Sequence, residues 1–200
     1  MSGVRPSHPA PSTVHIVIDF EYKKDIFRFR LPDELYIECL NISEECRKFK
    51  NHKLNYLRYL NNVGKNNYQC FIPIRYLQEG FLLPYFNDIF NKAIYATYNI
   101  KTNYVIKIIN TEFNDFMYDI WVNYCNKGDE NTKHIHTNCE YAAIIFIKNE
   151  NEITYFENGE KIKGKNGEML VFRHDLAHWT KKQKNIKERI TISFNISEKK

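Results

Sequence analysis

The sequence predicts a mainly β protein in which N-terminal helices support a C-terminal antiparallel β-sandwich or barrel. After about residue 101, short segments rich in aromatic and β-branched residues alternate with turn-like stretches, and no helical period lies between them. Residues 32–50 and 82–100 instead repeat their apolar side chains at helical spacing. Hydrophobic residues make up 43% of the chain and aromatic residues 15%, which is enough for a packed core.

The N-terminal half is expected to combine one hairpin with three helices. Residues 14–20 alternate apolar and polar side chains and read as a strand, with residues 25–31 as its hairpin partner. A helix is expected to start at Pro32, where Pro-Asp-Glu precedes an apolar period. A second, basic helix is expected over residues 53–61. The third covers residues 82–100 and has Pro84 near its first turn.

The C-terminal half is expected to consist of strands only. Polar, turn-like stretches such as residues 126–132 and 157–168 separate them. The expected strands span residues 103–113, 116–125, 140–148, 152–156, 168–172 and 189–196.

We expect a flexible arm over residues 1–13, where Pro, Ser and Gly dominate, followed by a single domain over residues 14–200. Within it, residues 14–100 form the support and residues 101–196 the β core. The five cysteines are scattered and odd in number, without a C-x-x-C pair, which favours a reduced, cytoplasmic setting. No apolar run approaches the roughly 20 residues of a membrane span. The net charge of +5 permits an anionic partner without indicating one.

Three histidines are the candidate functional residues. His134 and His136 are separated by one residue, so on a strand both side chains would project from the same face. Alone, such a pair is more often exposed or hydrogen-bonded than metal-binding. His178, just beyond a later strand, changes this balance. Imidazole is a common ligand of iron, zinc and copper, and three such ligands leave coordination positions open.

The order and spacing of residues between 117 and 196 resemble a known family. The residues that carry the resemblance are Trp121, Asn123, Gly128, His134, His136, Gly167 to Phe172, His178, Arg189, Ser193 and Asn195. The set is similar to the 2-oxoglutarate- and iron(II)-dependent oxygenases of the double-stranded β-helix fold, also called the jelly-roll or cupin-like fold. It is most similar to a group found in marine bacteria and their phages, related in fold to prolyl hydroxylases.

The resemblance implies a role for each matching residue. His134, His136 and His178 would be the catalytic residues that hold Fe(II), with His136 where most relatives have a carboxylate. Arg189 would pair with the distal carboxylate of 2-oxoglutarate, because a guanidinium can donate two parallel hydrogen bonds. Ser193 shares its strand face and would assist. The weaker candidates for the pocket are Asn123 and Asn195.

The implied function is that of an oxidoreductase, a dioxygenase that couples oxidative decarboxylation of 2-oxoglutarate to hydroxylation of a substrate C–H bond. Dioxygen and 2-oxoglutarate would be its partners. The substrate stays open among a peptidyl side chain, a nucleobase and a small metabolite. No membrane partner is expected, and the oligomeric state is open, a homodimer included. The chain departs from its relatives at Ala142, Ala143, Ile145 and Arg173 to Asp175, which would alter substrate preference.

Two other interpretations are kept. In a cupin-type enzyme that does not use 2-oxoglutarate, Glu140 would share the face of His136 and join the histidines as a ligand, and Arg189 would be dispensable. The other is a non-catalytic β-sandwich binding module. Trp121 and Trp179 are assigned to the core, and His174 and Asp175 to a loop at the rim.

Overall fold

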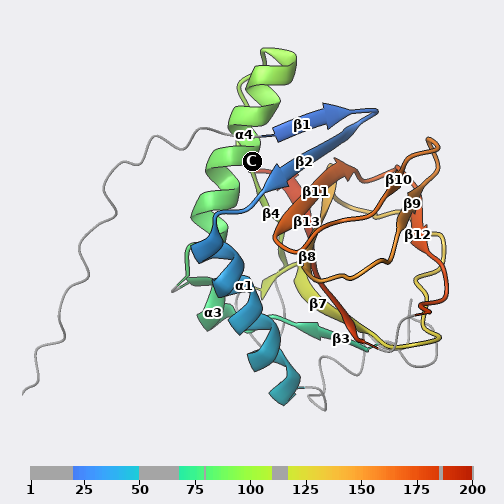
Figure 1. Ribbon diagram of the computed structural model, residues 1–200. Coiled ribbons are helices and arrows are strands. Elements are labelled where there is room, and N and C mark those ends of the chain that lie inside the picture. Colours follow the sequence, from blue (N-terminus) through green and yellow to red (C-terminus); the bar gives the residue numbers. More distant parts are fainter. Residues whose placement is uncertain (1–19, 50–67, 79, 110–116, 185–186, 200) are drawn as a thin grey trace, which may run out of the picture.

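Two antiparallel sheets face each other, and helices cover the outer side of the larger sheet (Figure 1). The computed structural model describes residues 20–49, 68–78, 80–109, 117–184 and 187–199. The expected arm over residues 1–13, most of the expected strand 14–20 and the expected helix 53–61 lie outside the described residues. Two facing antiparallel sheets of this kind form a jelly roll, or double-stranded β-helix, so the expected fold class is confirmed.

The large sheet has eight strands. Along it lie, in order, β1 (Phe20–Lys23), β2 (Ile26–Arg30), β11 (Glu168–Arg173), β8 (Tyr141–Lys148), β13 (Arg189–Glu198), β7 (Ile120–Cys125) and β3 (Tyr68–Phe71), with β4 (Tyr104–Ile106) paired to the end of β13. The small sheet contains β10 (Lys161–Ile162), β9 (Thr154–Phe156) and β12 (His178–Thr180). A separate pair joins β5 (Ile108–Ile109) to β6 (Met117–Tyr118).

The helices pack against the large sheet through one apolar face each. Helix α1 (Asp33–Cys46) follows Pro32, has two acidic residues in its first turn and continues into a 3-10 turn, η1 (Arg47–Phe49). Helix α4 (Leu82–Tyr98) ends at Asn99, whose left-handed backbone (φ 55°) closes the last turn. A short helix, α3 (Ile74–Gln78), precedes it. None of the helices in these described ranges has the length and hydropathy of a membrane span.

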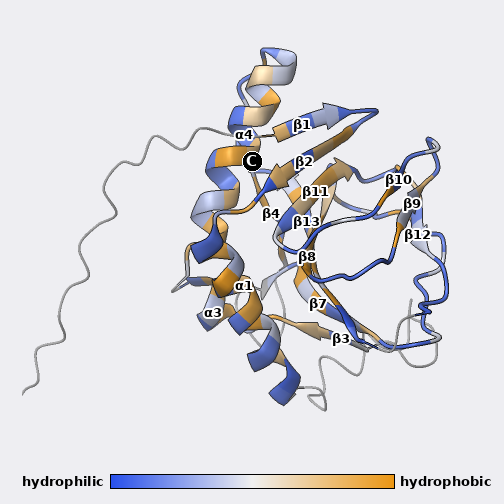
Figure 2. Cartoon of the chain, viewed as in Figure 1, coloured by the Kyte–Doolittle hydropathy of each residue, from blue (hydrophilic) through white to orange (hydrophobic). Residues whose placement is uncertain are grey.

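Strand alternation gives the large sheet two different faces. On β13, Ile190, Ile192 and Phe194 belong to the core under the helices, while the residues between them face the small sheet. A second, smaller apolar cluster fills one end of the space between the sheets; it consists of Ile26, Ala142, Ile144, Phe146, Phe156, Leu170 and Phe172. In Figure 2 the loops around the small sheet are largely hydrophilic. The space between the sheets is therefore apolar at one end and polar at the other.

Most expected elements are present, with shifted bounds. The helices at residues 32–50 and 82–100 are confirmed as α1 and α4. The hairpin is confirmed too, but its first strand is β1 rather than residues 14–20, because Lys24 and Asp25 form the turn with positive φ. The sequence analysis missed α3, β3, β10 and β12. All five cysteines are free and buried.

Candidate functional site

Three histidines meet at the polar end of the space between the sheets. His134 and His178 form an isolated β-bridge in which each backbone N–H donates to the other's carbonyl, at 3.1 and 3.0 Å. One ring nitrogen from each of His134, His136 and His178 lies within 4.8 Å of the other two. The expectation of a regular strand at His134 and His136 was wrong, since only His134 pairs, yet both rings reach the same point.

Hydrogen bonds fix the orientation of all three rings. Each Nδ1 lies beside an oxygen that can only accept: 2.7 Å from the Thr132 carbonyl for His134, 3.2 Å from the Leu176 carbonyl for His178 and 2.6 Å from Asn195 Oδ1 for His136. Nδ1 must therefore carry the proton in every ring, which leaves the lone pair on Nε2. Such outer hydrogen bonds are characteristic of histidines that ligate metals.

Burial keeps His178 neutral. Its side chain is 4% exposed and packs against Phe172, at 4.7 Å between ring centroids. Burial first, and then the neighbouring His134 and His136, lower the pKa of His178 well below its usual value. At neutral pH its ring is therefore uncharged, with the proton on Nδ1 and the lone pair on Nε2.

The polar residues of β13 line a cavity of about 380 Å³ together with the three histidines. Arg189, Thr191, Ser193 and Asn195 alternate with the apolar residues of the strand, so all four share the inner face, as predicted. Asn123, on the neighbouring strand β7, donates through Nδ2 to the hydroxyls of Ser193 (2.9 Å) and Thr191 (3.2 Å). The predicted pocket residues are thus assembled in one wall.

Arg189 is a buried cation that has no carboxylate partner in the part of the chain that the structure describes. It is 4% exposed and lines the cavity. Nε donates to Asn149 Oδ1 at 3.2 Å and an Nη atom to the Thr154 hydroxyl at 3.4 Å. Among the described residues, no Asp or Glu forms an ion pair with it; Glu188 instead pairs with Arg47, as its opposite strand direction predicts. A buried charge that lacks a counter-ion favours an anionic ligand.

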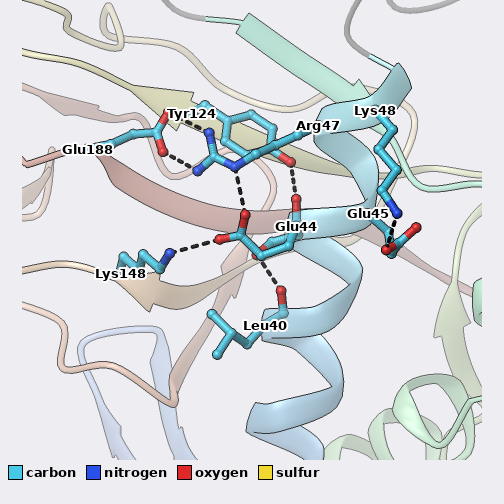
Figure 3. Close-up of polar contacts among 9 residues, drawn as sticks. Leu40, Glu44, Glu45, Arg47, Lys48, Tyr124, Lys148 and Glu188 are labelled. Carbon is cyan, nitrogen blue, oxygen red and sulfur yellow. Dashed lines mark hydrogen bonds and ion pairs between the residues drawn. The ribbon is translucent and has the colours of Figure 1, made fainter.

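Two ion pairs from the end of α1 secure the strand ends beside Arg189 (Figure 3). Arg47 donates to both carboxylate oxygens of Glu188, and its guanidinium lies 4.7 Å from the centre of the Tyr124 ring. Lys148 donates to Glu44 at 2.8 Å. Glu188 and Lys148 directly precede Arg189 and its partner Asn149. We call Arg47, Glu188, Glu44 and Lys148 the α1 clamp.

Both tryptophans line the cavity, and Trp121 is also buried, at 6% exposure. The Trp121 ring stacks on His136 with centroids 6.0 Å apart, and its Nε1 donates to Asn123 at 3.1 Å. The Trp179 ring packs on Tyr155, at 5.8 Å between centroids. A period-2 count would have placed Trp121 beside Asn123 on the inner face of β7.

Glu140 does not join the histidines. It is exposed, its carboxylate accepts the backbone N–H of Glu198 at 3.2 Å, and within the described part of the chain the metal-ligand cluster contains the three histidines alone. The chain bends at Asn138, whose φ is 60°, so Glu140 does not continue the face of His136. The cupin-type ligand set with Glu140 is therefore wrong. At the rim, Asp175 pairs with Arg173, and His174 bonds to the His136 carbonyl at 3.0 Å.

Thr154 and Asp119 are polar residues of the cavity wall that were not singled out from the sequence. Thr154, on β9, is 1% exposed and contacts Arg189. Asp119, between β6 and β7, is 6% exposed and accepts a hydrogen bond from Asn195 Nδ2. Neither belongs to a motif, because each comes from a short segment that only the fold brings to the cavity.

Comparison with known proteins identifies the fold. No family model matches the chain, and no curated protein matches its sequence. A prolyl-4-hydroxylase from Pseudomonas putida superimposes with a TM-score of 0.55 at 10% identity, over 88% of this chain and 94% of that one. The fold is that of a prolyl-4-hydroxylase.

Two further solved structures are similar. An oxidoreductase of the 2OG-Fe(II) oxygenase family from Burkholderia pseudomallei gives a TM-score of 0.49 at 10% identity, over 84% of this chain and 93% of that one. A Trichoplax adhaerens prolyl hydroxylase, in complex with a peptide fragment of the hypoxia inducible factor oxygen degradation domain, gives 0.48 at 11%, over 87% and 84%.

Proposed function

We propose that the protein is a 2-oxoglutarate- and Fe(II)-dependent dioxygenase that hydroxylates its substrate. One observation carries the proposal: three histidines whose ring nitrogens lie within 4.8 Å of one another line the same cavity as a buried arginine that forms no ion pair with a described Asp or Glu. The first group suits a divalent metal and the second suits a carboxylate. The prolyl-4-hydroxylase fold supports combining them in one reaction.

The donor set fits iron. Its ligands would be His134, His136 and His178, three neutral imidazoles whose Nδ1 hydrogen bonds point their lone pairs to one place. Three protein ligands leave positions for a bidentate 2-oxo acid and for dioxygen. When bound, iron would supply oxidative decarboxylation of 2-oxoglutarate to succinate and carbon dioxide, coupled to insertion of oxygen into a C–H bond.

The residues around Arg189 fit the other end of 2-oxoglutarate. Its guanidinium would accept the distal carboxylate as counter-ion, while Asn149 and Thr154 keep it oriented from behind. Ser193 and Thr191 line the wall between Arg189 and the histidines, where Asn123 already engages both hydroxyls. Asn195 acts on His136 rather than on the ligand.

The substrate would enter beside Trp121 and Ile135. Ile135 is 50% exposed and sits between the two histidines at the cavity mouth. The candidates are a peptidyl side chain, a nucleobase and a small metabolite. A prolyl-4-hydroxylase uses this fold, which favours hydroxylation of a peptidyl side chain as the first substrate class to test.

An anaerobic titration tests the cofactor site. The purified protein is titrated with Fe(II) and then with 2-oxoglutarate, and visible absorption is recorded. A charge-transfer band that needs both components is expected. It should disappear in Arg189→Ala, which retains iron binding, and in His178→Ala, which loses it. Arg173→Ala removes an exposed arginine outside the cavity and should retain the band.

Succinate formation is the second measurement. Aerobic incubation with Fe(II), ascorbate and 2-oxoglutarate should yield succinate from wild type and Arg173→Ala but not from Arg189→Ala. Iron binding without the band and without succinate would reject 2-oxoglutarate as the cosubstrate. Absence of metal binding would reject the proposal as a whole and leave a β-sandwich binding module.

A further inference from the structure

His136 differs from the other two histidines because its ring is connected to a buried carboxylate through one intervening side chain. Asn195 connects them: its Nδ2 donates to Asp119 Oδ2, and its Oδ1 lies 2.6 Å from His136 Nδ1. Asp119 and Asn195 are each 6% exposed. The rings of His134 and His178 instead bond to neutral backbone carbonyls.

The carboxylate of Asp119 determines which group donates and which accepts in each of these hydrogen bonds. A carboxylate oxygen accepts, so the amide of Asn195 must turn its NH2 group toward Asp119. Its carbonyl oxygen then faces His136, and the ring must place its proton on Nδ1. Asp119 thus fixes the amide, and the amide fixes the tautomer that places the lone pair on Nε2.

The backbone holds Asp119 in place for this task. Its N–H donates to the Lys107 carbonyl at 2.7 Å, and its own carbonyl accepts the N–H of Asn195 at 3.0 Å. Trp121, two residues later, stacks on the face of the His136 ring. The ring is therefore supported on one face by Trp121 and at its Nδ1 edge by Asn195.

We propose that Asp119 is a positioning residue for the metal centre, which acts through Asn195 to hold His136 as an Nδ1–H tautomer and to strengthen it as a metal ligand. The inference rests on the proposed function for its metal. Asp119 is not itself a ligand: the cluster that could hold a metal in the described part of the chain contains no carboxylate. Asp119 would act on the metal through its hydrogen bond to the Asn195 amide and the hydrogen bond of that amide to the His136 imidazole.

Metal affinity tests the strengthening effect. Asp119→Asn preserves the shape of the side chain and removes its charge, and the new amide can present either oxygen or NH2 to Asn195. We expect its affinity for Fe(II) and for the spectroscopic probe Co(II) to fall by about 10–100-fold. Asp88→Asn, on the exposed face of α4, is the matched control and should bind as wild type does. Unchanged affinity in a folded Asp119→Asn protein would overturn the proposal.

The tautomer is tested without metal, first in the wild type and then in the Asp119 variant. Proton–nitrogen NMR spectra of the histidine side chains in the metal-free wild type should show His136 protonated on Nδ1, with the signal assigned through His136→Gln. Asp119→Asn should shift that ring toward a mixture of tautomers and leave His134 and His178 unchanged. A His136 ring protonated on Nε2 in wild type overturns the proposal. This readout stands even if the protein fails to bind iron, which separates it from failure of the proposed function.

Discussion

Two strands that flank β8 in the same sheet, β11 and β13, face the small sheet with opposite chemistry. The inner residues of β11 include Leu170 and Phe172, which are fully buried in the apolar cluster. The inner residues of β13 include Thr191 and Ser193, which line the cavity. Both strands pair antiparallel with β8, so the backbone geometry is shared and the side chains alone differ. The jelly roll thus separates an end that stabilises the fold from an end that binds ligands.

At the polar end, Asn123 and its neighbours form hydrogen bonds with one another, but the charge of Arg189 is not neutralised by a described carboxylate. Asn123 Nδ2 serves both hydroxyls of β13, and its Oδ1 accepts from Gln69 Nε2 at 2.7 Å. Hydrogen bonds of this kind offset the desolvation of the groups that make them. Arg189 has hydrogen bonds but no counter-ion among the described residues. We infer that the ligand-binding end is less stable than the apolar end until an anion occupies it.

The largest expected effect comes from the apolar end. Leu170→Ala removes a fully buried side chain and should lower the free energy of unfolding by about 2–5 kcal/mol. Iron and 2-oxoglutarate affinity of the folded protein should stay unchanged, because Leu170 does not line the cavity. Urea denaturation and the anaerobic titration measure the two quantities. A loss of affinity that parallels the loss of stability would show that the two ends are not separate.

Arg189→Met should have the opposite effects: the ligand-free protein should become more stable, and stabilisation by 2-oxoglutarate should be lost. Replacing the buried cation by an apolar side chain of similar length should raise the free energy of unfolding of the ligand-free protein by about 1 kcal/mol. In wild type, 2-oxoglutarate with metal at 100 times its Kd should add about 2.7 kcal/mol, and the variant should lose this increment. Thermal unfolding with and without ligand measures both. A variant that is strongly destabilised without ligand would assign Arg189 a structural role instead.

The residues that share one face of β13 could be predicted from the sequence because the alternation of side chains along a strand is a local property. Arg189, Thr191 and Ser193 could be placed together from a spacing of two residues, and the structure agrees. Helix α1 could also be predicted from the sequence, since Pro32 and the following acidic residues mark its start.

What the sequence could not show depends on long-range pairing. His134 and His178 are joined by backbone hydrogen bonds across a sequence separation of 44 residues, and no local period signals a bridge of one residue pair. Strand β12 has three residues and β10 has two, too short for a recognisable pattern. Asp119 enters the site because β13 brings Asn195 to it. The sequence allowed a site shared by the three histidines, and the resemblance to a family implied that they hold one metal ion.

A pH titration of stability probes the buried histidine. The pKa of His178 is lowered well below its usual 6.5 in the folded protein, so below that pH the unfolded chain binds the proton first. Stability is therefore fully present above pH 6.5 and declines as pH falls, with a contribution of up to about 1.4 kcal/mol per pH unit from this group. Metal-free wild type should show the slope by urea denaturation, and His178→Asn should have a shallower one. Equal slopes would contradict the assignment.

The smallest effect is expected from the α1 clamp, and it tests whether the helices outside the sandwich tune the ligand end. Arg47→Ala removes the ion pair with Glu188 and the contact with the Tyr124 ring, and it should lower the free energy of unfolding by about 1 kcal/mol because these groups are partly exposed. Since Glu188 precedes Arg189, the variant should also bind 2-oxoglutarate a few-fold more weakly, with iron affinity unchanged. Lys92→Ala, which breaks an exposed ion pair on α4, should cost no more than about 0.5 kcal/mol and leave both affinities as in wild type. If Arg47→Ala altered stability alone, Arg189 would be held by Asn149 and Thr154 without help from the helix.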